Sequence, residues 1–171
     1  SKFCLHHASS GKIQNLELVG PWYYEMQELG FNYRMTDIQA ALGISQLKRL
    51  DEFKKRRRKI VKLYNEAFAD IEWLVTPYEA EGLSSCFHLY VLKFNFQKIG
   101  KSRTEVMKYL ASKKIGTQVH YIPVNKLPYY AKINTDKCNN TEQFYDTCLS
   151  IPLFPYLSDE QISYIISNII R

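Results

Sequence analysis

Three short segments carry the signature of a helix N-terminus, and they determine where much of this chain must be helical. In each one a Ser or Thr is followed three residues later by Gln or Glu: Thr36 and Gln39, Ser102 and Glu105, Ser158 and Gln161. The hydroxyl can accept a hydrogen bond from an early backbone N–H of the helix, and the longer side chain can reach back to the cap. We therefore expect helices to begin near residues 36, 102 and 158.

The spacing of apolar residues sets the lengths of these helices. After the first start, apolar residues recur at helical spacing to about Asp70, and Gly43 indicates two helices end to end or one with a bend. The second helix is expected to end at Gly116, since glycine commonly follows a last helical turn. The third is amphipathic, with Ile162, Ile165, Ile166, Ile169 and Ile170 on one face.

Strand patterns lie between the helices from about residue 71 onward. Residues 87–96 are apolar, β-branched and aromatic, and residues 117–122 form a second such run that Pro123 stops. Residues 141–148 favour a helix, and residues 149–154 a short strand that Pro152 restricts to a sheet edge. Residues 1–35 lack periodicity and are read as irregular. The predicted fold class is α/β, more narrowly α+β: a small mixed or antiparallel sheet with packed helices.

Composition limits the class of protein. In 171 residues, 46% are hydrophobic, enough for a sizeable core, and no apolar run approaches the ~20 residues that span a bilayer. No leader-like apolar segment opens the chain, so we expect a cytoplasmic location without membrane contact. The four cysteines are scattered, which argues against a disulfide framework. Cys4 and the pair His6-His7 have no second half at zinc-ligand spacing, and no metal site is predicted.

The formal net charge is +6, and six consecutive basic residues stand at positions 54–59. On a helix this run turns through about 600°, so it cannot present one face to nucleic acid. Arg57 falls on the apolar stripe and is expected to pair with a carboxylate, while the other five form a solvated face. Nucleic acid is therefore an unlikely partner, although a basic surface favours anions in general.

Two polar groups are candidates for ligand binding. Asn32 and Arg34 precede a helix N-terminus, where N–H groups and the helix dipole suit a phosphate, but ordinary capping explains them equally well. His120 and Tyr121 end a predicted strand, where a ligand can be held, but a lone histidine there is more often a structural hydrogen-bonding group. The residue pattern alone therefore favours a structural role for both groups over ligand binding.

Resemblance to a known family favours the ligand-binding reading. Residues 28–50 (ELGFNYRMTDIQAALGISQLKRL) resemble the hallmark segment of the DegT/DnrJ/StrS sugar aminotransferases, and the motifs at 56–58, 88–90, 118–123 and 149–155 follow in family order. These enzymes use pyridoxal phosphate (PLP) and have the fold of aspartate aminotransferase, called fold type I. The resemblance implies the C-terminal part of such an enzyme. Residues 1–45 would end the large PLP domain and start a long connecting helix, which residues 46–171 would complete before forming the small domain.

One branch of the family is most similar. Residues 20–25 (GPWYYE) and 118–123 (QVHYIP) resemble the branch of the pseudaminic-acid pathway. Its members move an amino group from glutamate to the C4 keto position of a UDP-linked deoxysugar, in nucleotide-sugar and surface-polysaccharide biosynthesis. The resemblance therefore implies glutamate and a UDP-linked amino or keto deoxysugar as substrates, PLP as cofactor, and a homodimer.

Site residues carry over only at matching positions. Asn32 would be offered across the dimer to the neighbouring subunit's PLP phosphate, and Arg34 would join it there or pair with Asp37. His120 and Tyr121 would face the sugar nucleotide, because an imidazole and a phenol suit a sugar ring. Tyr23, with Trp22 beside it, would shape the substrate entrance, although core or interface packing explains these two aromatic residues better.

The resemblance also implies an absence. The family's Schiff-base lysine lies in a Ser-x-x-Lys segment followed by Gly-Glu-Gly-Gly, and no lysine here has those surroundings. The only Glu-Gly, at residues 81–82, is followed by Leu83, and the family's His-Gly turn is His6-His7 here. We assign no catalytic residue and expect the chain to be inactive alone. The alternative is a non-catalytic basic domain that binds a sugar nucleotide or nucleic acid.

Overall fold

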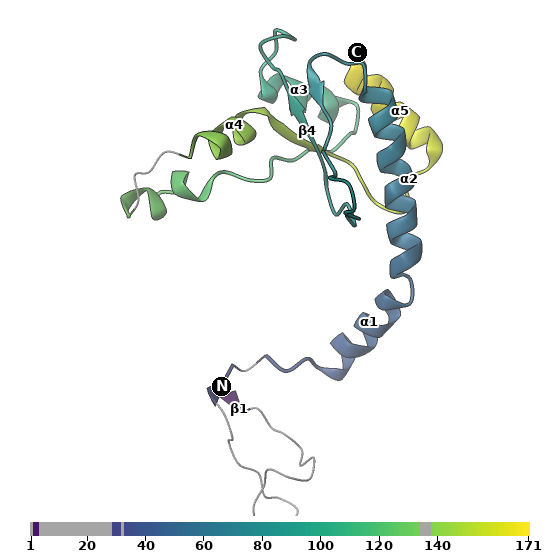
Figure 1. Ribbon diagram of the computed structural model, residues 1–171, viewed down its shortest axis with the longest axis vertical. Helices are drawn as coiled ribbons and strands as arrows, with labels where there is room; N and C mark the ends of the chain where they lie inside the picture. The colour runs from purple at the N-terminus through teal and green to yellow at the C-terminus, as the bar shows by residue number, and fades with distance from the viewer. Residues whose placement is uncertain (1, 4–28, 32, 134–137) are drawn as a thin grey trace, which may run out of the picture. The chain divides into compact units, whose positions relative to one another are not determined.

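The computed structural model describes residues 2–3, 29–31, 33–133 and 138–171, and the chain forms two compact units that divide after Lys48. The first unit holds the antiparallel pair β1 (Lys2–Phe3) and β2 (Leu29–Gly30) and the helix α1 (Asp37–Leu47) (Figure 1). The second unit contains, in chain order, α2 (Leu50–Phe68), β3 (Leu74–Val75), β4 (Tyr90–Phe94), α3 (Arg103–Ser112), the 3-10 turns η2 (Val124–Lys126) and η3 (Tyr130–Lys132), α4 (Asn139–Thr147), β5 (Cys148–Ile151) and α5 (Asp159–Ile170).

All three predicted helix starts are confirmed. The backbone N–H of the third helical residue donates to the capping hydroxyl at 3.3 Å in α1, 3.3 Å in α3 and 3.2 Å in α5. In each case the Gln or Glu side chain accepts from the backbone N–H of the cap, which completes the reciprocal pair. These starts depend on residues within one turn of each other, so the local sequence is enough to specify them.

The predicted long helix is two helices, but the break is not at Gly43. That glycine lies inside α1, and the helical run stops at Lys48 and Arg49, where Arg49 has φ −106° and ψ 0°. The guanidinium of Arg49 lies 4.6 Å from the centre of the Phe53 ring, and its Nη2 donates to the Tyr156 hydroxyl at 2.5 Å. A contact 107 positions along the chain thus holds the residue at the break.

The sheet of the second unit has the order β3-β4-β5, and both pairings are antiparallel, one of the two predicted arrangements. Residues alternate across its two faces. One face contributes Tyr90, Leu92 and Phe94, paired with Leu149 and Ile151, to a core that α2, α3 and α5 complete. The opposite face carries Val91, Lys93, Cys148 and Ser150, and α4 contacts β4.

Strand boundaries were predicted less well than helix starts. The strand expected over 87–96 is β4 alone, the helix expected over 141–148 is α4, and the two-residue β3 was missed. The strand predicted over 117–122 does not form. Within that run only Gln118 pairs, with Ser150, along the edge of β5 that faces away from β4. In that antiparallel register Gly116 would lie opposite Pro152, which has no N–H to donate, so pairing cannot extend in that direction. Pro152 itself lies just beyond β5.

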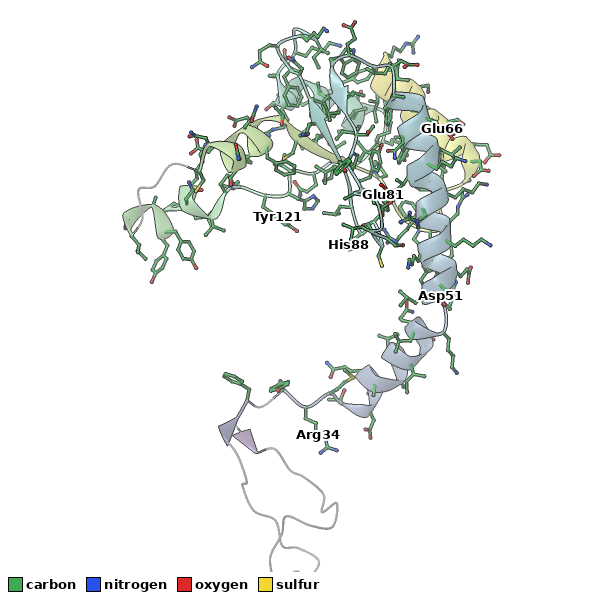
Figure 2. All side chains as sticks on the ribbon, viewed as in Figure 1. Arg34, Asp51, Glu66, Glu81, His88 and Tyr121 are labelled. Atoms are coloured by element: carbon green, nitrogen blue, oxygen red, sulfur yellow. The ribbon has the colours of Figure 1, made fainter. Side chains whose placement is uncertain are left out.

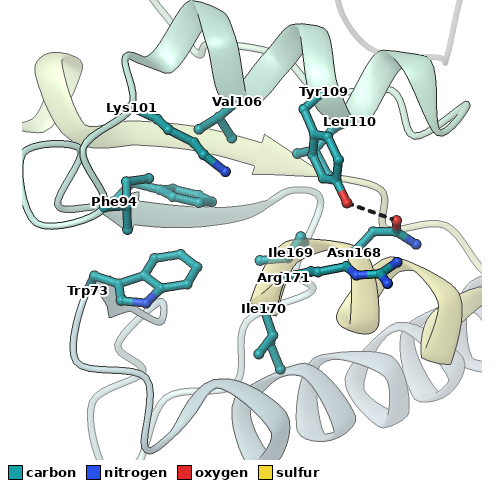
Figure 3. Close-up of a pocket in the computed structure, with 11 residues that line it drawn as sticks. Trp73, Phe94, Lys101, Val106, Tyr109, Leu110, Asn168, Ile169, Ile170 and Arg171 are labelled. Atoms are coloured by element: carbon teal, nitrogen blue, oxygen red, sulfur yellow. Dashed lines mark hydrogen bonds between the residues drawn. The ribbon is translucent and has the colours of Figure 1, made fainter.

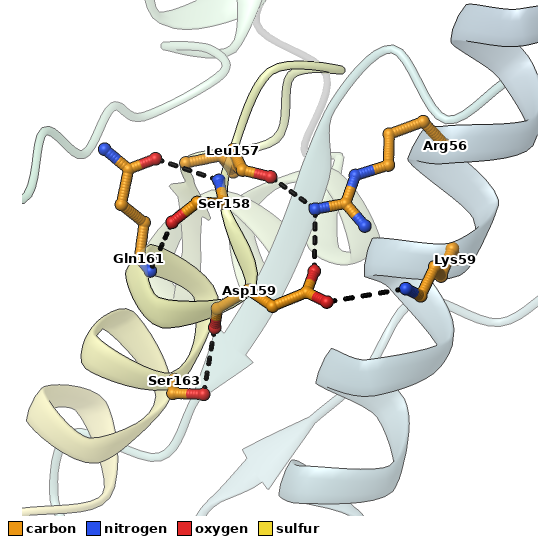
Figure 4. Close-up of polar contacts among 7 residues, drawn as sticks. All are labelled: Arg56, Lys59, Leu157, Ser158, Asp159, Gln161 and Ser163. Atoms are coloured by element: carbon orange, nitrogen blue, oxygen red, sulfur yellow. Dashed lines mark hydrogen bonds and ion pairs between the residues drawn. The ribbon is translucent and has the colours of Figure 1, made fainter.

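Helices α2 and α5 are joined by ion pairs as well as by the core (Figure 4). Asp159, in the first turn of α5, accepts from Arg56 at 2.8 Å and lies 3.5 Å from the Lys59 ammonium, and Arg56 also donates to the carbonyl of Leu157. A carboxylate in the first turn also complements the helix dipole. Arg56 is therefore not the solvated residue that the sequence predicted.

Candidate functional site

The bridge between Gln118 and Ser150 places His120 against the sheet face opposite the core. Gln118 and Ser150 exchange two backbone hydrogen bonds, of 3.2 and 2.8 Å. Two residues further on, His120 Nδ1 lies 2.8 Å from the Ser150 hydroxyl, within hydrogen-bonding distance. Ser150 is 5% exposed, so this partner is fixed inside the fold. No described residue hydrogen-bonds Nε2 of the same ring, which leaves that nitrogen to bind a ligand.

Tyr121 stands beside this histidine and is 74% exposed (Figure 2). The two rings meet edge to face, with centroids 4.7 Å apart and planes at 85°, and the peptide bond between them is cis. A held imidazole next to an exposed phenol offers one directional hydrogen bond and one amphipathic surface, which suits a hydroxylated ring such as a sugar. These two predicted site residues are adjacent in the sequence, and the fold adds the contact of His120 with Ser150.

A buried thiol lies on the same face of the sheet. Cys148 is fully buried, two residues before Ser150, and its Sγ lies 3.6 Å from the carbonyl of Tyr145. Burial raises the pKa of the Cys148 thiol, and the charge of Arg103 opposes that shift. A thiol held neutral in this way packs as a small apolar group and is not a nucleophile.

The basic segment of α2 is used largely inside the molecule. Arg57 Nη1 lies 3.2, 3.1 and 3.0 Å from the carbonyls of Phe87, His88 and Leu153, so the expected carboxylate partner is wrong. Arg58 makes two 2.9 Å hydrogen bonds to the Glu79 carboxylate, and these lower the pKa of Glu79. These contacts fix the loop that leads into β4 and leave fewer cations for nucleic acid than the sequence suggests.

The other predicted site residues are less informative. Asn32, Tyr23 and Trp22 lie outside the described residues, as do Cys4, His6 and His7. Arg34 is exposed and has no ion pair within 4.0 Å among the residues that the structure describes, so the alternative pairing with Asp37 is not seen. In the described part of the chain, no helix is long and apolar enough to cross a bilayer and no cluster of three metal-binding side chains occurs.

PLP, which the resemblance implies, does not have a complete site in the described residues. Every described side chain from 31 to 38 is exposed, so nothing there encloses a phosphate or an aromatic ring. These residues can supply at most one edge of a cofactor site.

One contributor to the site was missed. Ser150 lies within the motif at 149–155, and nothing in its sequence neighbours indicates that it faces His120. That contact spans 30 positions and depends on the register of the bridge at Gln118.

The fold is that of the C-terminal part of a fold-type I aminotransferase. The H. pylori aminotransferase PseC, involved in the biosynthesis of pseudoaminic acid, superposes with a TM-score of 0.80 at 27% identity, over 89% of this chain and 41% of that one. The model of the DegT/DnrJ/EryC1/StrS aminotransferase family matches residues 7–170, and the chain belongs to that family.

Two curated relatives support this family assignment. The spore coat polysaccharide biosynthesis protein SpsC of Bacillus subtilis is 38% identical over 169 residues, covering 96% of this chain and 43% of that protein. The UDP-4-amino-4,6-dideoxy-N-acetyl-beta-L-altrosamine transaminase of Campylobacter jejuni serotype O:2 is 36% identical over 132 residues, covering 77% and 35%. The chain thus spans less than half the length of the relatives that it matches.

Proposed function

We propose that this chain provides the small domain and the substrate-facing residues of a PLP-dependent sugar-nucleotide aminotransferase. The amino group would pass from glutamate to the C4 keto group of a UDP-linked deoxysugar. Residues 1–45 would end the large domain, and residues 46–171 would form the connecting helix and the small domain. In this arrangement His120 donates or accepts one hydrogen bond at the sugar, and Tyr121 contacts the ring.

One observation carries the proposal: His120 is held by a buried serine while its other ring nitrogen has no partner among the described residues. Tyr121, which is 74% exposed, lies edge to face against the imidazole and places an amphipathic surface beside that nitrogen. The relatives' names support the substrate class, since one acts on a UDP-linked amino sugar and another belongs to polysaccharide biosynthesis.

In the complete enzyme, this chain would supply only part of the cofactor site, and other parts of the enzyme would supply the rest. PLP, when bound, supplies the electron sink for amino transfer. Asn32 and Arg34 would contribute an amide and a guanidinium to the phosphate of the neighbouring subunit's cofactor in a homodimer. Because no lysine of this chain has the surroundings of the Schiff-base lysine, the chain alone should not transfer amino groups.

A chimera tests this function. Residues 1–171 would replace the matching C-terminal part of the Campylobacter transaminase, and amination of its UDP-linked keto sugar by glutamate would be followed. We expect activity, and a loss of at least tenfold in kcat/KM when His120 is changed to Ala. Lys108→Gln, an exposed change on α3, is the matched control and should leave kcat/KM unchanged. A folded, PLP-loaded chimera that does not aminate the sugar, or whose His120→Ala variant is fully active, would refute the proposal.

The contact between the Ser150 hydroxyl and His120 Nδ1 allows a second test. If Ser150 positions the imidazole, Ser150→Ala in the same chimera should raise KM for the sugar, and Ser150→Thr, which keeps the hydroxyl, should recover part of the loss. The nitrogen chemical shifts of His120 should report a changed mixture of tautomers in the alanine variant. Unchanged shifts together with unchanged KM would show that the serine has no positioning role.

A further inference from the structure

A cavity of about 190 Å³ lies on the core face of the sheet, between α3 and α5 (Figure 3). Its walls are mainly apolar: the rings of Trp73, Phe94 and Tyr109 and the aliphatic side chains of Val106 and Ile169. Phe94 and Ile169 also belong to the buried core, which gives the cavity a rigid floor. His120 and Ser150 lie on the opposite face of the same sheet, so this cavity is separate from the candidate site.

The size of the cavity sets the size of a ligand. An engineered apolar cavity of about 150 Å³ is sufficient to bind benzene. The space here, about 190 Å³, therefore accommodates one six-membered aromatic ring with a small substituent. Three aromatic walls offer edge-to-face and stacked contacts to such a ring, which an aliphatic ligand of the same volume would not make.

The charged residues at the cavity set the polarity of that substituent. The side chains of Lys101 and Arg171 line it, and no Asp or Glu side chain does. The Lys101 ammonium group lies 5.8 Å from the centre of the Tyr109 ring. Within the described residues, neither of these two cations has a carboxylate within 4.0 Å. A ligand carboxylate would thus meet cations that are not already paired.

A buried amide adds a neutral donor. Asn168 is 8% exposed; its Oδ1 accepts from the Tyr109 hydroxyl at 3.4 Å, and its Nδ2 donates to the Tyr164 carbonyl at 2.9 Å. An amide nitrogen carries two protons, so the second can still be donated inside the cavity. The hydrogen bond from Tyr109 is long, which allows the phenol to turn toward a ligand.

We propose that this cavity binds a single-ring aromatic carboxylate, with the ring between Trp73, Phe94 and Tyr109 and the carboxylate toward Lys101 and Arg171. The proposal does not depend on the aminotransferase function, because no residue that lines the cavity is used there. Binding would fix α5 against α3 and β4, and would stabilise the second unit by RT ln(1 + [L]/Kd), where [L] is the free ligand concentration.

Benzoate is the probe, and amide and indole NMR shifts of the full 171-residue chain are the readout. We expect the Trp73 indole and the Tyr109 amide to shift with a dissociation constant of about 1 mM, while benzyl alcohol binds more weakly. Lys101→Gln should weaken benzoate binding about two- to fivefold and leave benzyl alcohol unaffected. Lys108→Gln, on α3 but outside the cavity, is the control and should bind benzoate normally.

Three results would overturn the proposal. Benzoate could fail to shift the Trp73 indole at 20 mM, about twentyfold above the expected dissociation constant. It could bind no better than benzyl alcohol, or Lys101→Gln and Lys108→Gln could behave alike. Val106→Phe, which places a ring in the cavity, should abolish binding; if that variant does not fold, the shifts of the unmodified chain still decide.

Discussion

Changing Arg57 to Met tests whether the basic helix acts as an internal anchor. Nη1 lies 3.0 to 3.2 Å from three carbonyl oxygens on two separate segments of the second unit, but this nitrogen has only two protons. At most two full hydrogen bonds therefore exist at once, and hydrogen bonds to a charged group contribute about 1.5–3 kcal/mol each. Because Arg57 is only half-buried, water can partly replace it, and we expect a loss of about 2 kcal/mol.

The assay is urea unfolding followed by circular dichroism, with the free energy of unfolding extrapolated to water. Methionine keeps most of the apolar stem, so lost packing contributes little to the difference. Lys62→Met is the control on the same helix: Lys62 forms an exposed ion pair of 3.7 Å with Glu66 and no other within the part of the chain that the structure describes. The effect of this change should stay within about 0.5 kcal/mol. Arg57→Lys should recover part of the loss. If Arg57→Met changes stability no more than Lys62→Met does, the anchoring role is wrong.

Three further predictions concern stability. Tyr64→Phe removes a buried hydroxyl that donates to the Pro152 carbonyl at 2.9 Å, and should cost about 1–2 kcal/mol in thermal unfolding; a neutral effect would contradict it. Arg56 lowers the pKa of Asp159, so this stabilisation exists above the unfolded pKa of about 3.9 and is lost as pH falls through the folded pKa. Asp159→Asn should therefore lose less stability than the parent between pH 5 and pH 2, and parallel urea-unfolding profiles would refute this. Ser102→Ala should cost about 1 kcal/mol and speed hydrogen exchange in the first turn of α3, and unchanged exchange would count against the cap.

The parts of the fold that the sequence predicts correctly are those with local causes. A capping pair such as Ser158 and Gln161 forms within one helical turn, so the position of α5 follows from four adjacent residues. The apolar, β-branched and aromatic run at 87–96, which predicted the strand that forms as β4, is equally local.

The parts that escaped prediction depend on distant partners. Arg57 was placed correctly on the buried stripe of α2, but its acceptors are backbone carbonyls up to 96 positions away, and any residue type can offer a carbonyl. The helix break at Arg49 involves Tyr156, and the alignment of His120 depends on Ser150. For the site, the family resemblance selected His120 and Tyr121, whereas composition and spacing favoured a structural role for the histidine.

The ion pairs and core contacts that join α2 to α5 have a consequence for synthesis on the ribosome. Arg56 and Asp159 are 103 positions apart, and α5 supplies Ile162, Ile165 and Ile169 to the same core that α2 lines. Before α5 has been synthesised, the part of the apolar stripe of α2 that packs against α5 is exposed to solvent. The second unit can therefore complete its core only after α5 has left the exit tunnel, and until then part of the apolar stripe of α2 stays exposed.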